Sequence, residues 1–448
     1  MMSVTISKTI KNHKKTIAIY GLGNVGGAIA ACWLRAGAKV IGVDISKKLL
    51  SDIKTGKSHS KEPFVTDIFS KSLKSGNFIL TDDGVKASKN SDIKIIVVPV
   101  GLKKNKSDLK YVISASQTIS KGLKKGDVVV LSPSVPPGTT ENIVLPILEK
   151  QSKLKAERDF FLIYNPERIF EGRAIQDIEE NYPAIVAGLG PKSLDFGNNL
   201  LKIISKKGVM KMSNLATAEA EKLFEGVFRD VNIALANQLS DYCEKIGINF
   251  WDARKAANSQ PFCHLHFPGT GVGGLCIPVY PRIIIESANK IGKSMKLLEF
   301  SRRINDEMPK KCVKESISLL KQNRKVPKGK QIAVLGLGFR GEVTDKRLSP
   351  TYSVVDEFLK FGCSVSVHDP YIKEDDELPK EIHLSNNLSS VVNNADLIFI
   401  STDHKKYSNL SKSDFKNTKK PLLIYDGRNI LQKNLFDNMN LLTIGNYT

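Results

Sequence analysis

Cys276 stands in a segment rich in glycine, PGTGVGGLCIPVYP at 268–281. Glycines bring the backbone close to a ligand and expose its N–H groups. A cysteine in such a place can be a nucleophile if amides or cations stabilise its thiolate. The alternative is a buried structural cysteine, which is the expectation for the other cysteines, at 32, 243, 263, 312 and 363. The residues by themselves leave both interpretations open.

A second candidate for chemistry is the glycine turn formed by Gly21, Gly23 and Gly26, which follows the apolar run TIAIY. The first glycine permits a tight turn, the second lets a pyrophosphate approach, and the third allows the next helix to pack on the strand. Asp44 stands 23 positions after Gly21, at the expected end of the next strand. A carboxylate there can bind a ribose diol and would repel a 2′-phosphate, so the pattern predicts an NAD site rather than an NADP site.

The same glycine pattern returns at Gly336, Gly338 and Gly341, again directly after a predicted strand. The strand that follows ends at Asp369, about ten residues later than the fingerprint would place its acid. This turn is therefore either a second dinucleotide site or a similar fold that serves a different ligand.

The surrounding pattern supplies the elements that must position these residues. Strand candidates at 16–20, 39–43, 93–100, 127–133, 160–166 and 184–188 are separated by helical or loop segments, which predicts a parallel, doubly wound sheet. Residues 216–247 form one long helical pattern, with Leu223, Val227, Val231, Leu235 and Leu239 on one stripe, and a second helical region covers about 291–321. Strand and helix patterns resume from about 331, so the expected order is α/β, then α, then α/β.

Composition excludes several classes of protein. The chain has 448 residues, 41% hydrophobic and 25% charged, which is ordinary for a globular protein, and no apolar run long enough to span a membrane. The net charge of +21 comes from short, scattered lysine runs without interleaved aromatics, so we expect no nucleic-acid partner. The basic N-terminal segment lacks the apolar stretch of a signal peptide, and the cysteines form no CxxC pair, so we expect reduced thiols and a cytoplasmic location.

The chain resembles the UDP-glucose/GDP-mannose dehydrogenase superfamily over nearly its whole length. The matching motifs are IYGLGNVG, VPVGL, SPSVPPGTT, YNPERIFEG, EAEKLFEGVFRDVNIALAN, GVGGLCIP, VLGLGFRGEVTDKRLSP and YDGRN. The resemblance implies two Rossmann-like domains joined by a central long-helix domain. We expect an NAD-binding domain at 1–212, a helical dimerisation domain with the cysteine loop at 213–322, and a UDP-sugar-binding domain at 323–448. It also implies a homodimer or higher homo-oligomer.

The resemblance also implies a four-electron oxidation of a sugar's primary alcohol to a carboxylate. Cys276 matches the nucleophile that traps the intermediate aldehyde as a thiohemiacetal and then carries a thioester, with two NAD⁺ reduced per sugar. Lys222 matches the lysine that stabilises developing oxyanions, and Glu167 matches the carboxylate that acts as, or orients, the general base.

Binding residues follow by position. The expected cofactor-binding residues are Gly21, Gly23, Asn24, Val25, Gly26, Asp44, Val100, Ser134, Glu171 and Arg347. The expected substrate-binding residues are Glu167, Arg168, Lys222, Gly273, Arg340 and Arg428. No metal is expected, because Cys263, His264 and His266 lack the spacing of a closed metal site; a loop that contacts substrate or a partner subunit is the better interpretation.

Three positions depart from the family pattern. Gly226 replaces an asparagine, Leu275 replaces a histidine or serine, and Tyr280 replaces an acid. Losing one preorganised oxyanion donor costs about 100- to 1000-fold in rate. The main expectation is an active enzyme; the alternative is a degenerate paralogue that binds NAD or UDP-sugar without completing the oxidation.

The substrate is expected from NPER and FRDVNIALAN, which resemble the branch of the superfamily that acts on UDP-N-acetylhexosamines. UDP-N-acetyl-D-mannosamine is the first choice and UDP-N-acetylglucosamine the second. Arg168 is either a cation that faces the substrate or part of a salt bridge. The product would be a uronic acid donor for surface polysaccharide or protein glycans.

Overall fold

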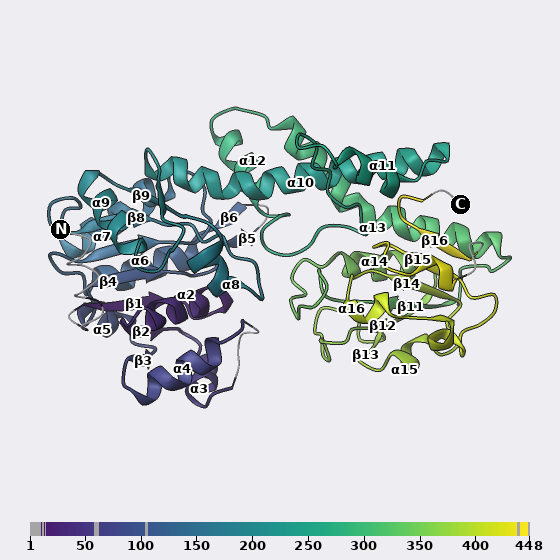
Figure 1. The fold of residues 1–448 in the computed structure, drawn as a ribbon, viewed down its shortest axis with the longest axis horizontal. Helices are drawn as coiled ribbons and strands as arrows, with labels where there is room; N and C mark the ends of the chain where they lie inside the picture. The colour runs from purple at the N-terminus through teal and green to yellow at the C-terminus, as the bar shows by residue number, and fades with distance from the viewer. Residues whose placement is uncertain are drawn as a thin grey trace. The chain divides into compact units, whose positions relative to one another are not determined.

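The computed structural model describes residues 10, 13, 15–57, 62–103, 106–436 and 440–446 (Figure 1). Most of the basic N-terminal segment considered above lies outside this part of the chain. The chain divides into two compact units, 1–224 and 225–448, and each is described by itself. Within the described residues, no helix combines the length and apolar character needed to cross a membrane.

The first unit is built on an eight-stranded sheet with the order β10-β9-β8-β7-β4-β1-β2-β3. Its strands are β1 Thr16–Tyr20, β2 Lys39–Val43, β3 Phe78–Thr81, β4 Ile93–Ile96, β7 Val128–Leu131, β8 Phe161–Tyr164, β9 Ala184–Gly188 and β10 Val209–Lys211. The order from β3 to β8 is that of a dinucleotide-binding sheet, with a switch point between β1 and β4. One expectation was wrong: β8 and β9 are antiparallel, because the connecting segment 165–183 returns the chain beside β8 instead of crossing over the sheet.

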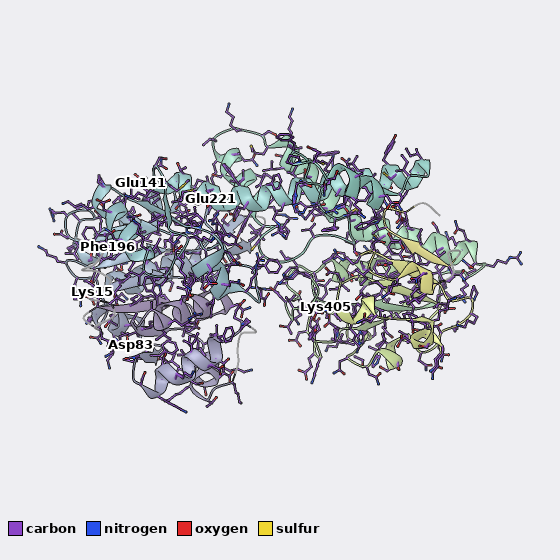
Figure 2. The ribbon with its side chains drawn as sticks, viewed as in Figure 1. Lys15, Asp83, Glu141, Phe196, Glu221 and Lys405 are labelled. Atoms are coloured by element: carbon purple, nitrogen blue, oxygen red, sulfur yellow. The ribbon has the colours of Figure 1, made fainter. Side chains whose placement is uncertain are left out.

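Helices cover both faces of this sheet. They are α2 Asn24–Arg35, α3 Lys47–Lys54, α4 Val65–Lys74, α5 Gly84–Lys89, α6 Lys110–Ser120, α7 Leu145–Ser152, α8 Ala174–Gln176 and α9 Pro191–Leu201, with a small hairpin of β5 Gly101–Lys103 and β6 Lys106–Asp108. In β1, Ile17 and Ile19 belong to one apolar cluster while Ala18 and Tyr20 belong to the other. On α9, Phe196 (labelled in Figure 2) stacks on Phe161 of β8 with ring centroids 5.4 Å apart. Burial on both faces explains why the strands read as continuous apolar runs.

The long helix α10 covers Leu215–Ile246, which confirms the helix predicted at 216–247. The predicted apolar stripe was wrong in its details, since Leu235 is 45% exposed. The buried face instead includes Gly226, Asp230 and Asn237. Polar residues occupy it because they hydrogen-bond to neighbouring segments, as described below.

The second unit continues with α11 Phe250–Ala257, α12 Tyr280–Lys290 and α13 Lys296–Gln322, followed by a six-stranded, wholly parallel sheet. Its strands are β11 Gln331–Leu335, β12 Ser364–His368, β13 His383–Ser385, β14 Leu397–Ile400, β15 Ile424–Asp426 and β16 Leu441–Thr443, and its helices include α14 Pro350–Lys360, α15 Leu388–Val392 and α16 Lys405–Ser408. The order β13-β12-β11-β14-β15-β16 again has a dinucleotide-binding topology. Helix α12 was not expected, because the glycine-rich pattern before it suggested irregular chain.

The fold class predicted from the sequence is confirmed: the chain forms two doubly wound α/β sheets, and a helical region lies between them in the sequence (Figure 1). The boundary between the compact units falls inside α10, whereas the sequence placed boundaries at 212/213 and 322/323. The three-domain division itself stays a prediction.

Candidate active site

The first glycine turn has the shape that a dinucleotide needs. Gly21 has φ +99°, and a Cβ there would lie 2.4 Å from the Val97 carbonyl oxygen. A Cβ on Gly26 would lie 1.9 Å from the Gly21 oxygen, so the turn packs too closely for a side chain. Gly23, in contrast, has no atom of the described residues beyond its two chain neighbours within 4 Å of the place where its Cβ would stand. The open space lies directly before α2, where helical N–H groups attract phosphate.

Polar residues around this turn hold it in place. The Asp44 carboxylate accepts hydrogen bonds from the backbone N–H groups of Leu22 and Ser46, both at 2.9 Å. The Asn24 side chain donates to Glu171 at 3.2 Å, which brings together two residues predicted to bind the cofactor. Val25 and Val100 are partly buried against the apolar clusters on the two faces of the sheet. These contacts fit an NAD site at the carboxyl ends of β1 and β2.

Gly23→Ala is expected to weaken NAD binding by about tenfold or more while leaving the unfolding temperature nearly unchanged, because its methyl group would meet none of the described residues beyond its chain neighbours. Gly26→Ala should lower both the NAD affinity and the unfolding temperature, since its methyl group would overlap the Gly21 carbonyl. Titration with NAD⁺ and thermal unfolding of both variants measure the two effects. Wild-type NAD affinity in Gly23→Ala would contradict the placement of the pyrophosphate.

The second glycine turn is built differently. Asp369 is fully buried and accepts hydrogen bonds from the backbone N–H groups of Leu337 and Gly338, at 2.8 and 3.0 Å. His404 accepts from the Glu342 N–H through Nδ1, so its Nε2 carries the proton and faces Asp369 at 3.2 Å. Although burial raises the pKa of Asp369, the hydrogen bonds from His404 and Gly338 bring it down to about 2.

Asp369 is thus committed to contacts within the protein and offers no exposed carboxylate to a ribose. In addition, α14 begins only at Pro350, so no helix starts inside the turn formed by Gly336, Gly338 and Gly341. Both facts favour the second alternative from the sequence, a similar fold with a different ligand.

The cysteine loop is fixed on the second sheet's domain by its glycines. A Cβ on Gly273 would lie 2.6 Å from both the Leu348 carbonyl oxygen and the Phe339 Cβ, and the Gly274 N–H donates to the Arg347 carbonyl at 2.9 Å. The glycines therefore bring the backbone close to the protein's own chain, which is a different reason from the ligand contact that the sequence suggested. The predicted role of Gly273 in substrate binding stays a prediction.

Exposure separates Cys276 from the other cysteines. Cys276 is exposed, Cys263 is intermediate, and the remaining four are buried. Burial raises the pKa of the Cys312 thiol to about 12 and that of Cys363 to about 11, which disfavours their thiolates. The accessible thiol therefore lies on the glycine-rich loop.

The predicted binding arginines have distinct surroundings. The Arg428 Nε donates to the Ser401 carbonyl at 2.7 Å, at the carboxyl ends of β14 and β15, and its Nη2 is buried with no hydrogen-bond partner among the described residues. Arg340 is half-buried in the second glycine turn. Arg347 is exposed and pairs with Asp345, its Nε lying 2.8 Å from Oδ1, and its contact with the cofactor stays a prediction.

Arg168 makes contacts within the first unit. Its Nη2 donates to the Pro183 carbonyl at 2.7 Å, and its Nη1 lies 3.8 Å from a carboxylate oxygen of Glu221, the α10 residue labelled in Figure 2. The guanidinium also lies 5.3 Å from the centre of the Tyr182 ring. These contacts match the salt-bridge alternative, and substrate binding by Arg168 stays a prediction.

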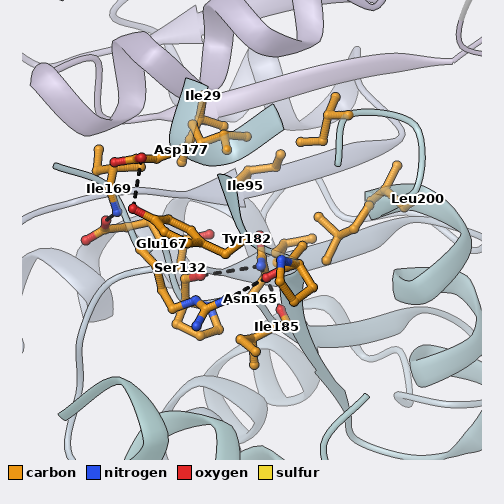
Figure 3. Close-up of a pocket in the computed structure, with 18 of the residues that line it drawn as sticks. Ile29, Ile95, Ser132, Asn165, Glu167, Ile169, Asp177, Tyr182, Ile185 and Leu200 are labelled. Atoms are coloured by element: carbon orange, nitrogen blue, oxygen red, sulfur yellow. Dashed lines mark hydrogen bonds between the residues drawn. The ribbon is translucent and has the colours of Figure 1, made fainter. Parts of the chain in front are cut away.

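Glu167 follows the end of β8 and lines a cavity in the first unit (Figure 3). Most of the lining is aliphatic or aromatic, as at Ile29 and Ile95, and the buried Ser132 hydroxyl has no hydrogen-bond partner among the described residues. Such a lining is typical of an interior void rather than of a site for a charged ligand.

Ser134 lies just after β7, half-buried, and Lys222 is buried on α10 at 6% exposure.

Glu167 and Lys222 belong to the first unit, whereas Cys276 and the arginines at 340, 347 and 428 belong to the second. The contacts of these predicted residues are therefore described for each unit by itself.

A buried polar network not expected from the sequence supports the cysteine loop. Asp230 on α10 forms an ion pair with Arg302 on α13, and the Asn305 amide donates to Asp230 Oδ1 at 2.8 Å. The Asn237 amide donates to Asn305 at 3.0 Å, while its Oδ1 accepts from the Gly269 N–H at 3.0 Å. The motif FRDVNIALAN thus fixes the start of the glycine-rich loop. The spacing of Asp230 and Asn237 by two helical turns was the available signal.

The metal prediction concerned Cys263, His264 and His266. In the described part of the chain, the carboxylates that could share an ion are those of Asp241, Glu244 and Glu315. They surround Lys311, whose Nζ lies 2.9 Å from Glu244 and 3.3 Å from Asp241, so the group is an ion-pair cluster. The segment with the histidines is tied to α10, since the Asn232 amide donates to the His264 carbonyl at 2.8 Å.

The sheet topology and the open glycine turn define a dinucleotide-binding protein with a second, modified domain of the same fold. Comparison with known proteins resolves the class further: the chain belongs to the UDP-glucose/GDP-mannose dehydrogenase family. Models of that family match in three parts, the NAD binding domain at 15–204, the central domain at 216–307 and the UDP binding domain at 333–433.

Similar proteins carry more specific names. A UDP-N-acetyl-D-mannosamine dehydrogenase from Pyrococcus horikoshii is 32% identical over 93% of this chain and 96% of its own length. A solved UDP-D-ManNAc dehydrogenase from the same organism superposes with a TM-score of 0.88 at 32% identity, covering 96% of this chain and 99% of the other. An NDP-N-acetyl-D-galactosaminuronic acid dehydrogenase from Methanosarcina mazei superposes with a TM-score of 0.83 at 30% identity, covering 98% of each chain.

The protein is therefore an NAD-dependent nucleotide-sugar dehydrogenase, an oxidoreductase with a UDP-binding C-terminal domain. This confirms the predicted enzyme class and cofactor, and it explains why the second glycine turn lacks the features of an NAD site.

Proposed function

We propose that this enzyme oxidises the primary alcohol of a UDP-N-acetylhexosamine to the uronate through a thioester on Cys276. UDP-N-acetyl-D-mannosamine is the preferred candidate for the substrate, and UDP-N-acetylglucosamine is the second candidate. The observation that carries the mechanism is the position of Cys276, an exposed thiol on a loop fixed by close-packed glycines. The names of the similar proteins from Pyrococcus horikoshii support the choice of sugar.

In this proposal the Cys276 thiolate adds to the carbonyl carbon of the intermediate aldehyde, and the aldehyde oxygen takes up a proton to give a thiohemiacetal. The second oxidation removes hydride and a proton and leaves a thioester. Water then attacks the thioester, which releases the carboxylate and returns the thiolate. NAD⁺, when bound, accepts one hydride in each oxidation, so the full reaction yields two NADH per sugar.

Lys222 and Glu167 are proposed to act on the same sugar carbon. The buried ammonium of Lys222 would stabilise the oxygen as it becomes negative, and burial strengthens such an interaction by lowering the local dielectric. Glu167 would accept the proton that leaves the alcohol or the attacking water, directly or through a water molecule.

Arg428 is proposed to bind the diphosphate or the sugar oxygens. Its buried Nη2 is available for a ligand oxygen because no described residue accepts from it, and Nε is already fixed by Ser401. Arginine suits phosphate since it can donate two parallel hydrogen bonds. Arg340 is proposed to assist from the second glycine turn.

The test uses purified protein, NAD⁺ and a panel of UDP-ManNAc, UDP-GlcNAc, UDP-GalNAc, UDP-glucose and GDP-mannose. Two NADH per UDP-ManNAc, with the highest kcat/KM in the panel, are expected. One NADH per sugar would show that the reaction stops at the aldehyde and would sink the thioester route. A clear preference for UDP-GalNAc would move the assignment towards the Methanosarcina mazei relative.

The predicted homo-oligomer is supported by an apolar stripe along α10. Its exposed members, 45–58% accessible, are Phe224, Phe228, Leu235, Tyr242 and Ile246. Apolar side chains that recur on one helix face and stay exposed are typical of an interface. We propose a second copy of this chain as the partner that covers this stripe.

We also propose a cytoplasmic location for the enzyme. Its product would serve as a donor for polysaccharide or protein glycans.

A further inference from the structure

Tyr280 lies one helical turn after Cys276. The backbone N–H groups of Val279 and Tyr280 both donate to the Cys276 carbonyl, at 3.2 and 3.0 Å, and the turn continues into α12. Residues four apart in such a turn share one face. The Tyr280 hydroxyl consequently reaches the Cys276 sulfur and donates to Sγ at 3.4 Å. Only 5% of Tyr280 is exposed, so its ring is held by its neighbours.

The ring of Tyr280 occupies space that Gly226 on α10 leaves open. A Cβ at position 226 would lie 2.4 Å from the Tyr280 Cδ2 and 3.1 Å from its Cγ. A distance of 2.4 Å is shorter than the sum of the van der Waals radii of two carbon atoms, so a Cβ at position 226 would overlap the ring. An asparagine at 226 therefore cannot coexist with this tyrosine in its observed position.

Two of the departures from the family pattern are consequently one structural change. Glycine at 226 leaves the space that the Tyr280 ring occupies, and a Cβ there would overlap the ring. Glycine in the middle of a helix costs about 1 kcal/mol relative to alanine, so its presence inside α10 calls for such a reason.

We propose that the Tyr280 hydroxyl hydrogen-bonds to the Cys276 thiolate during the reaction, and that Gly226 is present to admit the tyrosine ring. This inference rests on the proposed thioester route. A phenol that donates to sulfur stabilises the thiolate before it attacks the aldehyde, and again when water expels it from the thioester. The hydroxyl keeps its proton throughout, so the role requires no further acid or base. Tyr280 touches the reacting sulfur and is in that sense a catalytic residue.

The test titrates the thiol without any sugar. Iodoacetamide alkylates Cys276 at a rate that follows its thiolate fraction, and mass spectrometry assigns the label to that cysteine. Tyr280→Phe is expected to move the midpoint of this pH profile upward by about one pH unit, a tenfold loss of thiolate below the midpoint. Tyr111→Phe, at a tyrosine that is 40% exposed in the first unit, is the matched control and should leave the profile unchanged.

Gly226→Ala should produce a similar upward movement by displacing the ring. The double variant Gly226→Ala/Tyr280→Phe should move the profile no further than Tyr280→Phe does, because both changes remove one hydrogen bond. Thermal unfolding shows whether each variant is folded, and Tyr280→Phe deletes a single oxygen atom. An unchanged profile in folded Tyr280→Phe, or additive movements in the double variant, would overturn the proposal.

The thiol titration and the activity measurement have separate outcomes. A shifted profile together with continued acid formation by Cys276→Ala would reject the thioester route while confirming the hydrogen bond. An unshifted profile together with loss of acid in Cys276→Ala would confirm the route and reject the role of Tyr280.

Discussion

Cys276→Ala is expected to form no uronic acid, with turnover to acid at least about a thousandfold below wild type. The reason is that alanine has no group that can hold the aldehyde covalently between the two oxidations. The glycine turn and Asp44 belong to the first unit and Cys276 to the second, so NAD affinity should stay within about twofold of the wild-type value. Acid formation is measured by separating the products chromatographically, and NAD affinity by titration.

Cys263→Ala is the matched control for this variant. Cys263 is half-buried, its sulfur lies 3.5 Å from the Asn258 side chain, and it has no proposed part in the thioester chemistry. It should form acid at nearly the wild-type rate. Acid formation by Cys276→Ala at a comparable rate would remove the thioester route while leaving the enzyme class in place.

The sequence predicted the dinucleotide-binding turn because its three glycines lie within six residues, directly between a strand and a helix. Gly21 and Gly26 are required by contacts with the turn itself and with the segment after β4, whereas a Cβ on Gly23 would meet no other described residue, and its contact with NAD stays a prediction. The strands β1, β2 and β9 began and ended where their apolar runs did. Structural features that depend on residues close together in the sequence can be predicted from the sequence.

The buried face of α10 could not be read in the same way. Helical spacing predicted a stripe through Leu235, yet the helix buries Asp230 and Asn237 and exposes that leucine. The choice depends on Arg302 and Asn305, which are more than 60 residues away along the chain and complete the hydrogen bonds of those polar groups. A buried polar residue is stable only with its partner, and the partner's position is a property of the fold.

Gly226 and Tyr280 illustrate the same limit at the site. From the sequence they are two separate losses, an amide and an acid, and both argue for weaker catalysis. In the structure the tyrosine ring occupies the space beside the glycine, and its hydroxyl reaches the sulfur. The loss of the amide donor at 226 and the gain of the hydroxyl donor at 280 can be recognised as one change only when the structure places both residues side by side.

Asp230→Ala is expected to lower the free energy of unfolding by about 3–5 kcal/mol, because it leaves the guanidinium of Arg302 buried without its main partner. Arg302 is 4% exposed, and Asp230 is fully buried. Burial raises the pKa of Asp230 even beside Arg302, because desolvation of the carboxylate outweighs the attraction of the guanidinium. Urea or thermal unfolding of the purified protein measures the loss.

Asp306→Ala provides the matched control, because Asp306 pairs with the same guanidinium from the next turn of α13 but is 46% exposed at its side chain. Exposed ion pairs contribute about 0.2–1 kcal/mol, so this variant should lose far less stability than Asp230→Ala. Equal losses would mean that burial of the pair is not what stabilises it. Since Asn305 and Asn237 connect Asp230 to the Gly269 N–H, the Asp230 variant should also release the cysteine loop and lower kcat more than Asp306→Ala does. A destabilised Asp230→Ala with unchanged kcat would separate the stability of the helices from the positioning of Cys276.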